Sequence, residues 1–116
     1  MLTKEQLVEI SNKATFGKEL EDIYFTIGRK MEESASSGMR TFQIECIKPK
    51  AHKNVAFGAN GVQNYLYVFV KDGYSINQYS EKIEECLMNN GFTRRDIECA
   101  TITNNYYSSV QITVRW

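Results

Sequence analysis

Hydrophobic and polar positions alternate most regularly at the end of the chain. The apolar positions there are Val110, Ile112, Val114 and Trp116, and the polar ones between them are Gln111, Thr113 and Arg115. A two-residue period is typical of a β-strand with one buried face, so we predict a strand over 106–116 whose end belongs to the core. Similar patterns predict strands over 40–47 and 97–103. Asn104-Asn105 is the expected two-residue turn between the last two strands.

A denser apolar run follows the middle of the chain, from Tyr65 to Lys71. Leu66, Val68 and Val70 alternate there with aromatic residues. Because both faces are apolar, we predict either a central strand covered on both sides or a strand whose outer face meets a partner. This strand and the one over 97–103 could be parallel neighbours, which the crossover rule permits but does not require.

Spacings of three and four residues predict helices in the first third of the chain. Thr3 and Gln6 form a capping box that begins the first helix, and Phe16-Gly17 is expected to end it. A second helix is predicted from Lys18 to Ser37, with Gly38 as its left-handed C′ residue. The two helices form a hairpin, or merge into one bent helix if Gly17 is tolerated.

A third helix begins at the capping box of Ser75 and Gln78 and ends at Asn90-Gly91-Phe92. The predicted order is therefore α-α-β-β-α-β-β. We expect one α+β domain over residues 1–116, with a mainly antiparallel sheet and helices on one face.

Charge and cysteine content narrow the functional classes. Lys plus Arg and Asp plus Glu each number 14 in 116 residues, so no net field favours nucleic acid or a membrane surface. Cys46, Cys86 and Cys99 are odd in number and lack a CxxC pair, which argues against a disulfide framework or a metal site and suggests small buried hydrophobes. No signal peptide is apparent and no cofactor is indicated, so a cytoplasmic protein is expected.

The irregular stretch 48–64 is the first candidate binding region. Its candidate ligand-binding residues are Lys48, Lys50, His52, Lys53, Phe57 and Asn60. Lysines offer charge to phosphates, a glycine-containing loop lets backbone N–H groups approach an anion, and an aromatic ring can stack on a base. A nucleotide or small anion is the ligand that this composition favours, and a solvated hairpin is the alternative.

Aromatic residues form the second candidate surface. The candidate interface residues are Tyr65, Tyr67, Tyr106, Tyr107 and Trp116. Tyrosine is common at interfaces because it brings a large area at a low entropic cost. Half-buried sheet residues are the alternative. A strand at the chain end that lies at a sheet edge would also favour a homodimer by strand pairing.

Catalytic motifs are not found. His52 is the only histidine and has no nearby orienting partner, and no GxSxG, HExxH or dinucleotide fingerprint is present. We therefore expect a non-enzymatic binding protein.

The order of these elements resembles small uncharacterised bacteriophage accessory proteins. The likeness rests on the boundary Ser37-Gly38, on the helix end Asn90-Gly91-Phe92 and on a hairpin that ends in Ile112-x-Val114-x-Trp116. The resemblance implies a virus-encoded protein in the host cytoplasm that binds a host macromolecule, for example to inhibit a defence system. No functional residue is implied by it.

Overall fold

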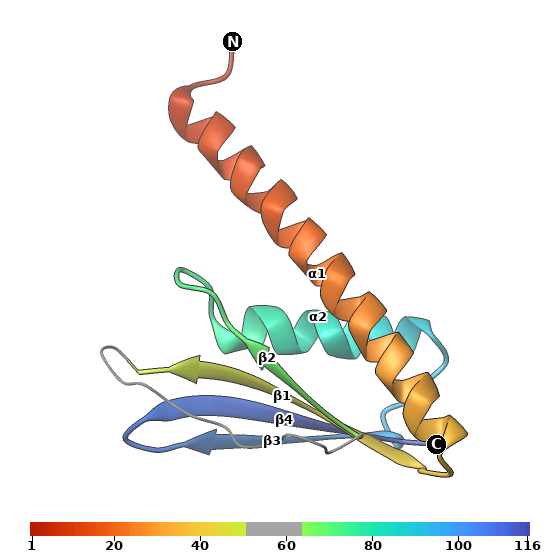
Figure 1. Ribbon diagram of the computed structural model, residues 1–116. Coiled ribbons are helices and arrows are strands. Elements are labelled where there is room, and N and C mark those ends of the chain that lie inside the picture. The colour runs from red at the N-terminus through yellow and green to blue at the C-terminus, as the bar shows by residue number, and fades with distance from the viewer. Residues whose placement is uncertain (51–63) are drawn as a thin grey trace.

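The computed structural model describes residues 1–50 and 64–116. In this part of the chain two helices lie on the same face of a four-stranded sheet (Figure 1). The elements are α1 (Lys4–Ser36), β1 (Thr41–Pro49), β2 (Tyr65–Phe69), α2 (Ile76–Asn89), β3 (Ile97–Thr103) and β4 (Tyr107–Arg115). The expected α+β arrangement with helices on one face is confirmed. The predicted ligand residues His52, Lys53, Phe57 and Asn60 lie outside the described residues.

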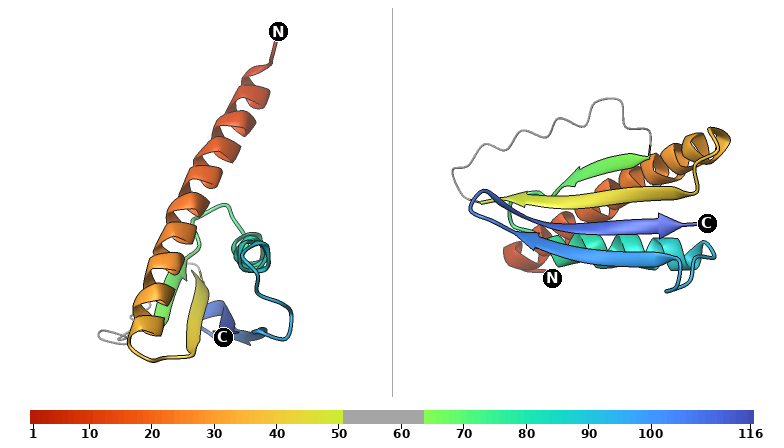
Figure 2. Two further views of the ribbon diagram at one scale, coloured as in Figure 1. Left: turned by 90° about the vertical axis from the view of Figure 1, so that its right-hand side faces the viewer. Right: turned by 90° about the horizontal axis from the view of Figure 1, so that it is seen from below.

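The strand order is β2-β1-β4-β3. β1 pairs in parallel with β2 and antiparallel with β4, and β3 pairs antiparallel with β4, so the sheet is mixed but mainly antiparallel. Two expectations are wrong. β2 lies at an edge of the sheet and not at its centre, on the opposite side from β3, and β4 is an inner strand and not an edge (Figure 2).

The core lies between the sheet and the helices. Its fully buried side chains include Phe42 and Ile44 of β1, Ile112 and Val114 of β4, and Tyr79 and Ile83 of α2. Trp116 packs against this cluster, and its backbone N–H donates to the backbone carbonyl of Arg40 at 3.1 Å. The end of the chain is thus held against the core, as the alternating pattern predicts.

Of the two alternatives for the residues before 38, the helical hairpin is wrong and the merged helix is confirmed, because α1 is continuous through Gly17. The interior glycine costs roughly 1 kcal/mol relative to alanine. Long-range packing offsets that cost, because the ring of Phe16 stacks on Tyr74 with centroids 4.6 Å apart and meets Tyr79 edge-on at 5.3 Å. The sequence near Gly17 carries no sign of these contacts, since both tyrosines come from the α2 region.

The two predicted capping boxes and the predicted helix ends at Gly38 and Gly91 are confirmed, whereas the expected end at Phe16-Gly17 is wrong. Both capping boxes form, at Thr3 with Gln6 and at Ser75 with Gln78. Gly91 has a φ of 97°, and the N–H of Phe92 donates to the carbonyl of Leu87 at 3.2 Å. These bonds satisfy carbonyls that the last turn of α2 leaves without helical partners.

The hairpin between β3 and β4 turns one residue later than predicted. The N–H of Asn104 donates to the carbonyl of Tyr107 at 3.0 Å, which places Asn105 and Tyr106 in the turn. The side chain of Asn104 accepts from the N–H groups of Tyr106 and Tyr107 at 2.8 and 2.9 Å. The expected asparagine turn is therefore built on a side-chain hydrogen bond of its first residue.

Candidate functional site

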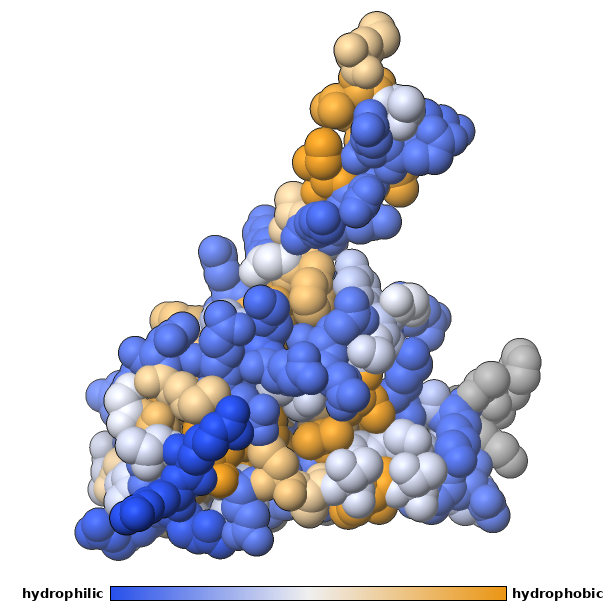
Figure 3. Space-filling model, turned by 180° about the vertical axis from the view of Figure 1, so that it is seen from behind, coloured by the Kyte–Doolittle hydropathy of each residue, from blue (hydrophilic) through white to orange (hydrophobic). Residues whose placement is uncertain are grey.

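The N-terminal half of α1 projects away from the sheet and from α2 (Figure 1). Residues 1–15 are all exposed, and the first side chain that packs on the body is Phe16. Leu7, Val8 and Ile10 nevertheless expose 53%, 49% and 53% of their surfaces. Figure 3 shows apolar side chains gathered on this projecting end. Leu7 and Ile10 are three positions apart and share one side of the helix, whereas Val8 lies roughly 160° from Ile10 around the axis and lines a hollow beside Tyr74. We call Leu7 and Ile10 the helical ridge.

Sequence reasoning missed the helical ridge because it assigned these residues to a packed helix. The signal was present in the phase of the apolar positions. At 100° per residue, Leu7, Ile10 and Ala14 are rotated by roughly 120° from the stripe that contains Leu20 and Ile27. One straight helix cannot turn both stripes toward the same core, so one of them must face elsewhere.

Hollows flank the place where α1 meets α2. A hollow of about 540 Å³ lies between the two helices, over Leu20, Tyr24 and Cys86. A smaller one of about 300 Å³ lies in the angle below the projecting half and includes Val8 and Tyr74. Both contain Phe16 and Lys13, so the surface is concave on both sides of the point where α1 leaves the body.

Of the predicted aromatic interface residues, Tyr65, Tyr67 and Tyr107 lie on the sheet face away from the helices, whereas Trp116 packs against the core. Tyr65 and Tyr67 are adjacent on β2, with ring centroids 4.8 Å apart, and Phe69 continues the row with 53% of its surface exposed. Both tyrosines are half-buried. Tyr107 is on the same face, but it belongs to β4, which is separated from β2 by β1. Tyr106 lies in the hairpin turn, with 57% of its surface exposed. The structure thus brings Tyr65 and Tyr67 together and leaves the other aromatic candidates apart.

A buried carboxylate lies next to these rings. Glu45 of β1 is opposite Tyr67 in the β1–β2 register and is only 4% exposed. It accepts hydrogen bonds from the Tyr65 hydroxyl at 2.5 Å and from Nε2 of Gln111 at 3.4 Å. These donors offset the cost of removing the carboxylate from water. Burial and the bond to Glu45 raise the pKa of Tyr65, so its hydroxyl stays a donor at neutral pH. Tyr65 is therefore tied to the sheet.

Of the predicted anion ligands, Lys48 and Lys50 are in the described residues. The ammonium of Lys48 donates to the carbonyl of Tyr74 at 2.6 Å, which fixes the segment before α2. Lys50 is exposed, and both lysines line a hollow of about 470 Å³ beside Ser75 and Asn77 at the start of α2. The two lysines do come together, but one of them already has a structural partner.

The three cysteines are free, and burial raises the pKa of each thiol. Cys46 is buried, as expected, and its pKa is raised to about 12. Cys99 differs from the expectation of a buried residue, because it is exposed on β3, where its thiol donates to Glu84. The thiol itself is partly shielded from water, and this desolvation, with the bond to Glu84 as the next largest cause, raises the pKa of Cys99 to about 12. None of the three is therefore a thiolate nucleophile at neutral pH.

Within residues 1–50 and 64–116, no group of three or more His, Cys, Asp or Glu side chains is placed to hold a metal ion. No helix in that part of the chain has the length and apolar character that crossing a bilayer requires.

No protein-family model, curated protein or solved structure matches this chain.

Proposed function

We propose that this chain is a non-enzymatic binding protein that docks on another macromolecule through the helical ridge. The observation that carries the proposal is that Leu7 and Ile10, on one side of the projecting half of α1, each expose 53% of their surface. Contiguous exposed apolar side chains commonly mark interaction sites. An amphipathic helix presented in this way suits an apolar groove on a partner.

The charges around the helical ridge favour a protein partner. Lys4, Glu5, Glu9 and Lys13 balance one another, and Glu9 and Lys13 form an ion pair at 3.3 Å. Nucleic acid and acidic lipid attract surfaces with a basic excess, which this helix lacks. The resemblance to bacteriophage accessory proteins supports a host protein as the partner, and inhibition of a host defence system is one role that such docking would serve.

The test is affinity capture from bacterial lysate followed by titration of the captured protein against purified variants. Leu7→Glu combined with Ile10→Glu should weaken binding about 100-fold or more, because each buried side chain of this size contributes roughly 1.5–3 kcal/mol. Met88→Glu is the matched control, since Met88 is an apolar residue of α2 that is 37% exposed and lies outside the helical ridge. Equal binding by the double variant and by the wild-type protein would refute the docking role of the ridge.

A small-anion binding protein is the second candidate. The hollow that includes Lys48 and Lys50 at the start of α2 favours it. A thermal-shift screen with nucleotides and signalling dinucleotides tests it, because a ligand that binds the native state raises the unfolding temperature by mass action. No shift with any compound, or an equal shift with Lys50→Ala, would remove this candidate.

A further inference from the structure

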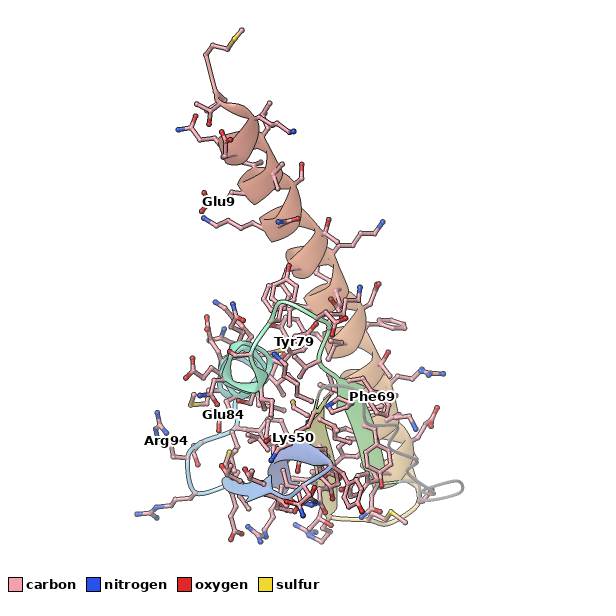
Figure 4. The ribbon with its side chains drawn as sticks, turned by 90° about the vertical axis from the view of Figure 1, so that its left-hand side faces the viewer. Glu9, Lys50, Phe69, Tyr79, Glu84 and Arg94 are labelled. Atoms are coloured by element: carbon pink, nitrogen blue, oxygen red, sulfur yellow. The ribbon has the colours of Figure 1, made fainter. Side chains whose placement is uncertain are left out.

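The two edges of the sheet differ in how they are protected. β2 has five residues, and α1 lies beside it, with Glu19, Asp22 and Thr26 lining a hollow together with residues 66–69. β3 has seven residues, and α2 packs mainly on β4 and β1 and touches β3 through the bond between Glu84 and Cys99. Cys99, Ala100 and Thr101 are consequently exposed in the middle of β3. Figure 4 shows Phe69 on the β2 side and Glu84 and Arg94 on the β3 side of the molecule.

The sequence of β3 lacks the lysine and proline residues that commonly prevent a free sheet edge from pairing with another chain. Natural edge strands are commonly protected by lysine, proline, bulges or a covering element, because unpaired backbone groups recruit other chains. β3 reads IECATIT, and its β-branched residues favour an extended backbone. Glu98 is its only charged residue, and Arg115 of β4 already pairs with that carboxylate at 2.7 Å.

Two backbone hydrogen bonds show which groups of β3 face outward. The N–H of Arg115 donates to the carbonyl of Asp96, and the N–H of Asn104 donates to the carbonyl of Tyr107. Hydrogen-bonded pairs alternate along an antiparallel ladder, so the even-numbered residues of β3 bond to β4. The N–H and C=O groups of the odd-numbered residues therefore point to the free edge, and these residues are Ile97, Cys99, Thr101 and Thr103.

We propose that β3 pairs antiparallel with β3 of a second copy of this chain, about a two-fold axis at Ala100. In that register Ile97 lies opposite Thr103 of the second copy, and Cys99 lies opposite its Thr101. Every outward N–H and C=O is then used, whereas a shift by two residues leaves an end residue unpaired. The product is a continuous eight-stranded sheet with all helices on one face.

The side chains at the axis fit this arrangement. Ala100 lies opposite Ala100 of the second copy in a non-hydrogen-bonded pair. Side chains approach most closely in such pairs, and a methyl group fits the available space. Glu98 lies opposite Ile102 of the second copy, so no like charges meet. A hollow of about 180 Å³ beneath α2, which includes Ile97 and Cys99, opens beside the same edge and would be covered by the threonines of the second copy. This self-complementarity is why a second copy, and not an unrelated strand, is the occupant.

A cysteine cross-link tests the register. In a Cys99→Ser background, Ala100→Cys should form a covalent dimer under mild oxidation, because Cα atoms across such a pair are about 4.5 Å apart and disulfides need roughly 4.4–6.8 Å. Glu98→Cys in the same background is the matched control. It lies on the same face of the same strand, but its symmetry mate would be about 14 Å away. Cross-linking by Glu98→Cys as fast as by Ala100→Cys would overturn the proposal.

Solution mass tests the interface itself. Edge pairing buries an area at the low end of specific interfaces, below about 1,200 Å², so we expect twice the 13.4 kDa chain mass only near about 100 µM or above. Thr101→Pro removes an outward N–H without touching the β4 ladder and should give a monomer. Either of two results would overturn the proposal: a wild-type monomer at that concentration, or a dimer that survives Thr101→Pro and is lost in Leu7→Glu/Ile10→Glu. The second result would assign self-association to the helical ridge.

Discussion

The two halves of α1 belong to one helix, yet they are stabilised in different ways. From Phe16 onward the helix packs on the body, with Leu20 6% and Ile27 5% exposed. Before Phe16 its side chains are all exposed, and the body contributes the hydrogen bond that the Tyr74 hydroxyl donates to the carbonyl of Asn12 at 3.4 Å. Isolated helices of that length are marginal in water, so the projecting half owes its order to the packed half that continues it. Tertiary packing at one end of a helix thus also orders a segment whose own side chains are exposed.

The largest effect should come from a cavity in the packed half. Ile27→Ala should lower the free energy of unfolding by about 2–5 kcal/mol, because it removes buried methyl groups from the core. Leu7→Ala, in the projecting half, should change it by less than about 0.5 kcal/mol. Urea unfolding of both variants measures the contrast, and similar losses would mean that the projecting half is packed in solution.

The next effect should come from the junction between the halves. Phe16→Ala removes the stack on Tyr74 and should cost roughly 1–3 kcal/mol. It should also release amide protection over residues 4–15, because the helix then begins at a later contact. Hydrogen exchange measures this, and unchanged protection there would show that the projecting half does not depend on Phe16.

A pH-dependent effect should come from Tyr79, which joins the packed half of α1 to α2 (Figure 4). Its hydroxyl donates to Glu19 at 3.0 Å, and burial, with this bond contributing, raises the pKa of Tyr79 to about 12. Above pH 10 the unfolded chain releases this proton while the folded chain keeps it. The contribution to stability is therefore present below pH 10 and is lost as the pH rises toward 12.

Tyr79→Phe isolates this contribution. At pH 8 the variant should be less stable than the wild-type protein by about 1 kcal/mol, since it lacks the hydrogen bond. At pH 11 the difference should shrink by about 1 kcal/mol, because only the wild-type protein carries the proton linkage at this position. Urea unfolding at both pH values measures it, and a constant difference would contradict the raised pKa.

The smallest effect should come from Gly17, at the boundary of the halves. A Cβ atom there would meet nothing within 4 Å. Gly17→Ala should therefore stabilise the chain by roughly 0.5–1 kcal/mol and raise helix protection on both sides of the boundary. A loss of stability in thermal melts would show that the helix needs to bend at this point.

Features set by neighbouring residues were predictable from the sequence. The two capping boxes, the left-handed glycines Gly38 and Gly91 and the burial of the inward positions of β1 and β4 all follow from short-range rules. The pattern also predicted a solvent-exposed outer face for β1, which is wrong at Glu45 and Ile47, because both are buried. Features set by distant residues were not predictable. The continuity of α1 depends on tyrosines that are 58 or more positions away in the chain. The edge position of β2 depends on the pairing of β1 with β4 on its other side.

The candidate surfaces divide in the same way. Tyr65 and Tyr67 could be placed together because residues two apart in a strand share a face. The burial of Glu45 beneath them could not, because it depends on the pairing of two strands and on Gln111 of a third. The helical ridge was readable from the phase of the apolar positions, but only once α1 was known to be a single helix.

The stack of Phe16 on Tyr74 lies at the point about which the projecting half of α1 would pivot against the rest of the molecule. Leu7 is nine positions away along the helix, or about 14 Å, so a 10° swing of the projecting arm moves it by about 2.4 Å. A load applied to that tip would be felt first by the two stacked rings. A molecule bound at the tip would therefore exert a turning force on α2 and on the sheet, transmitted through the two stacked rings.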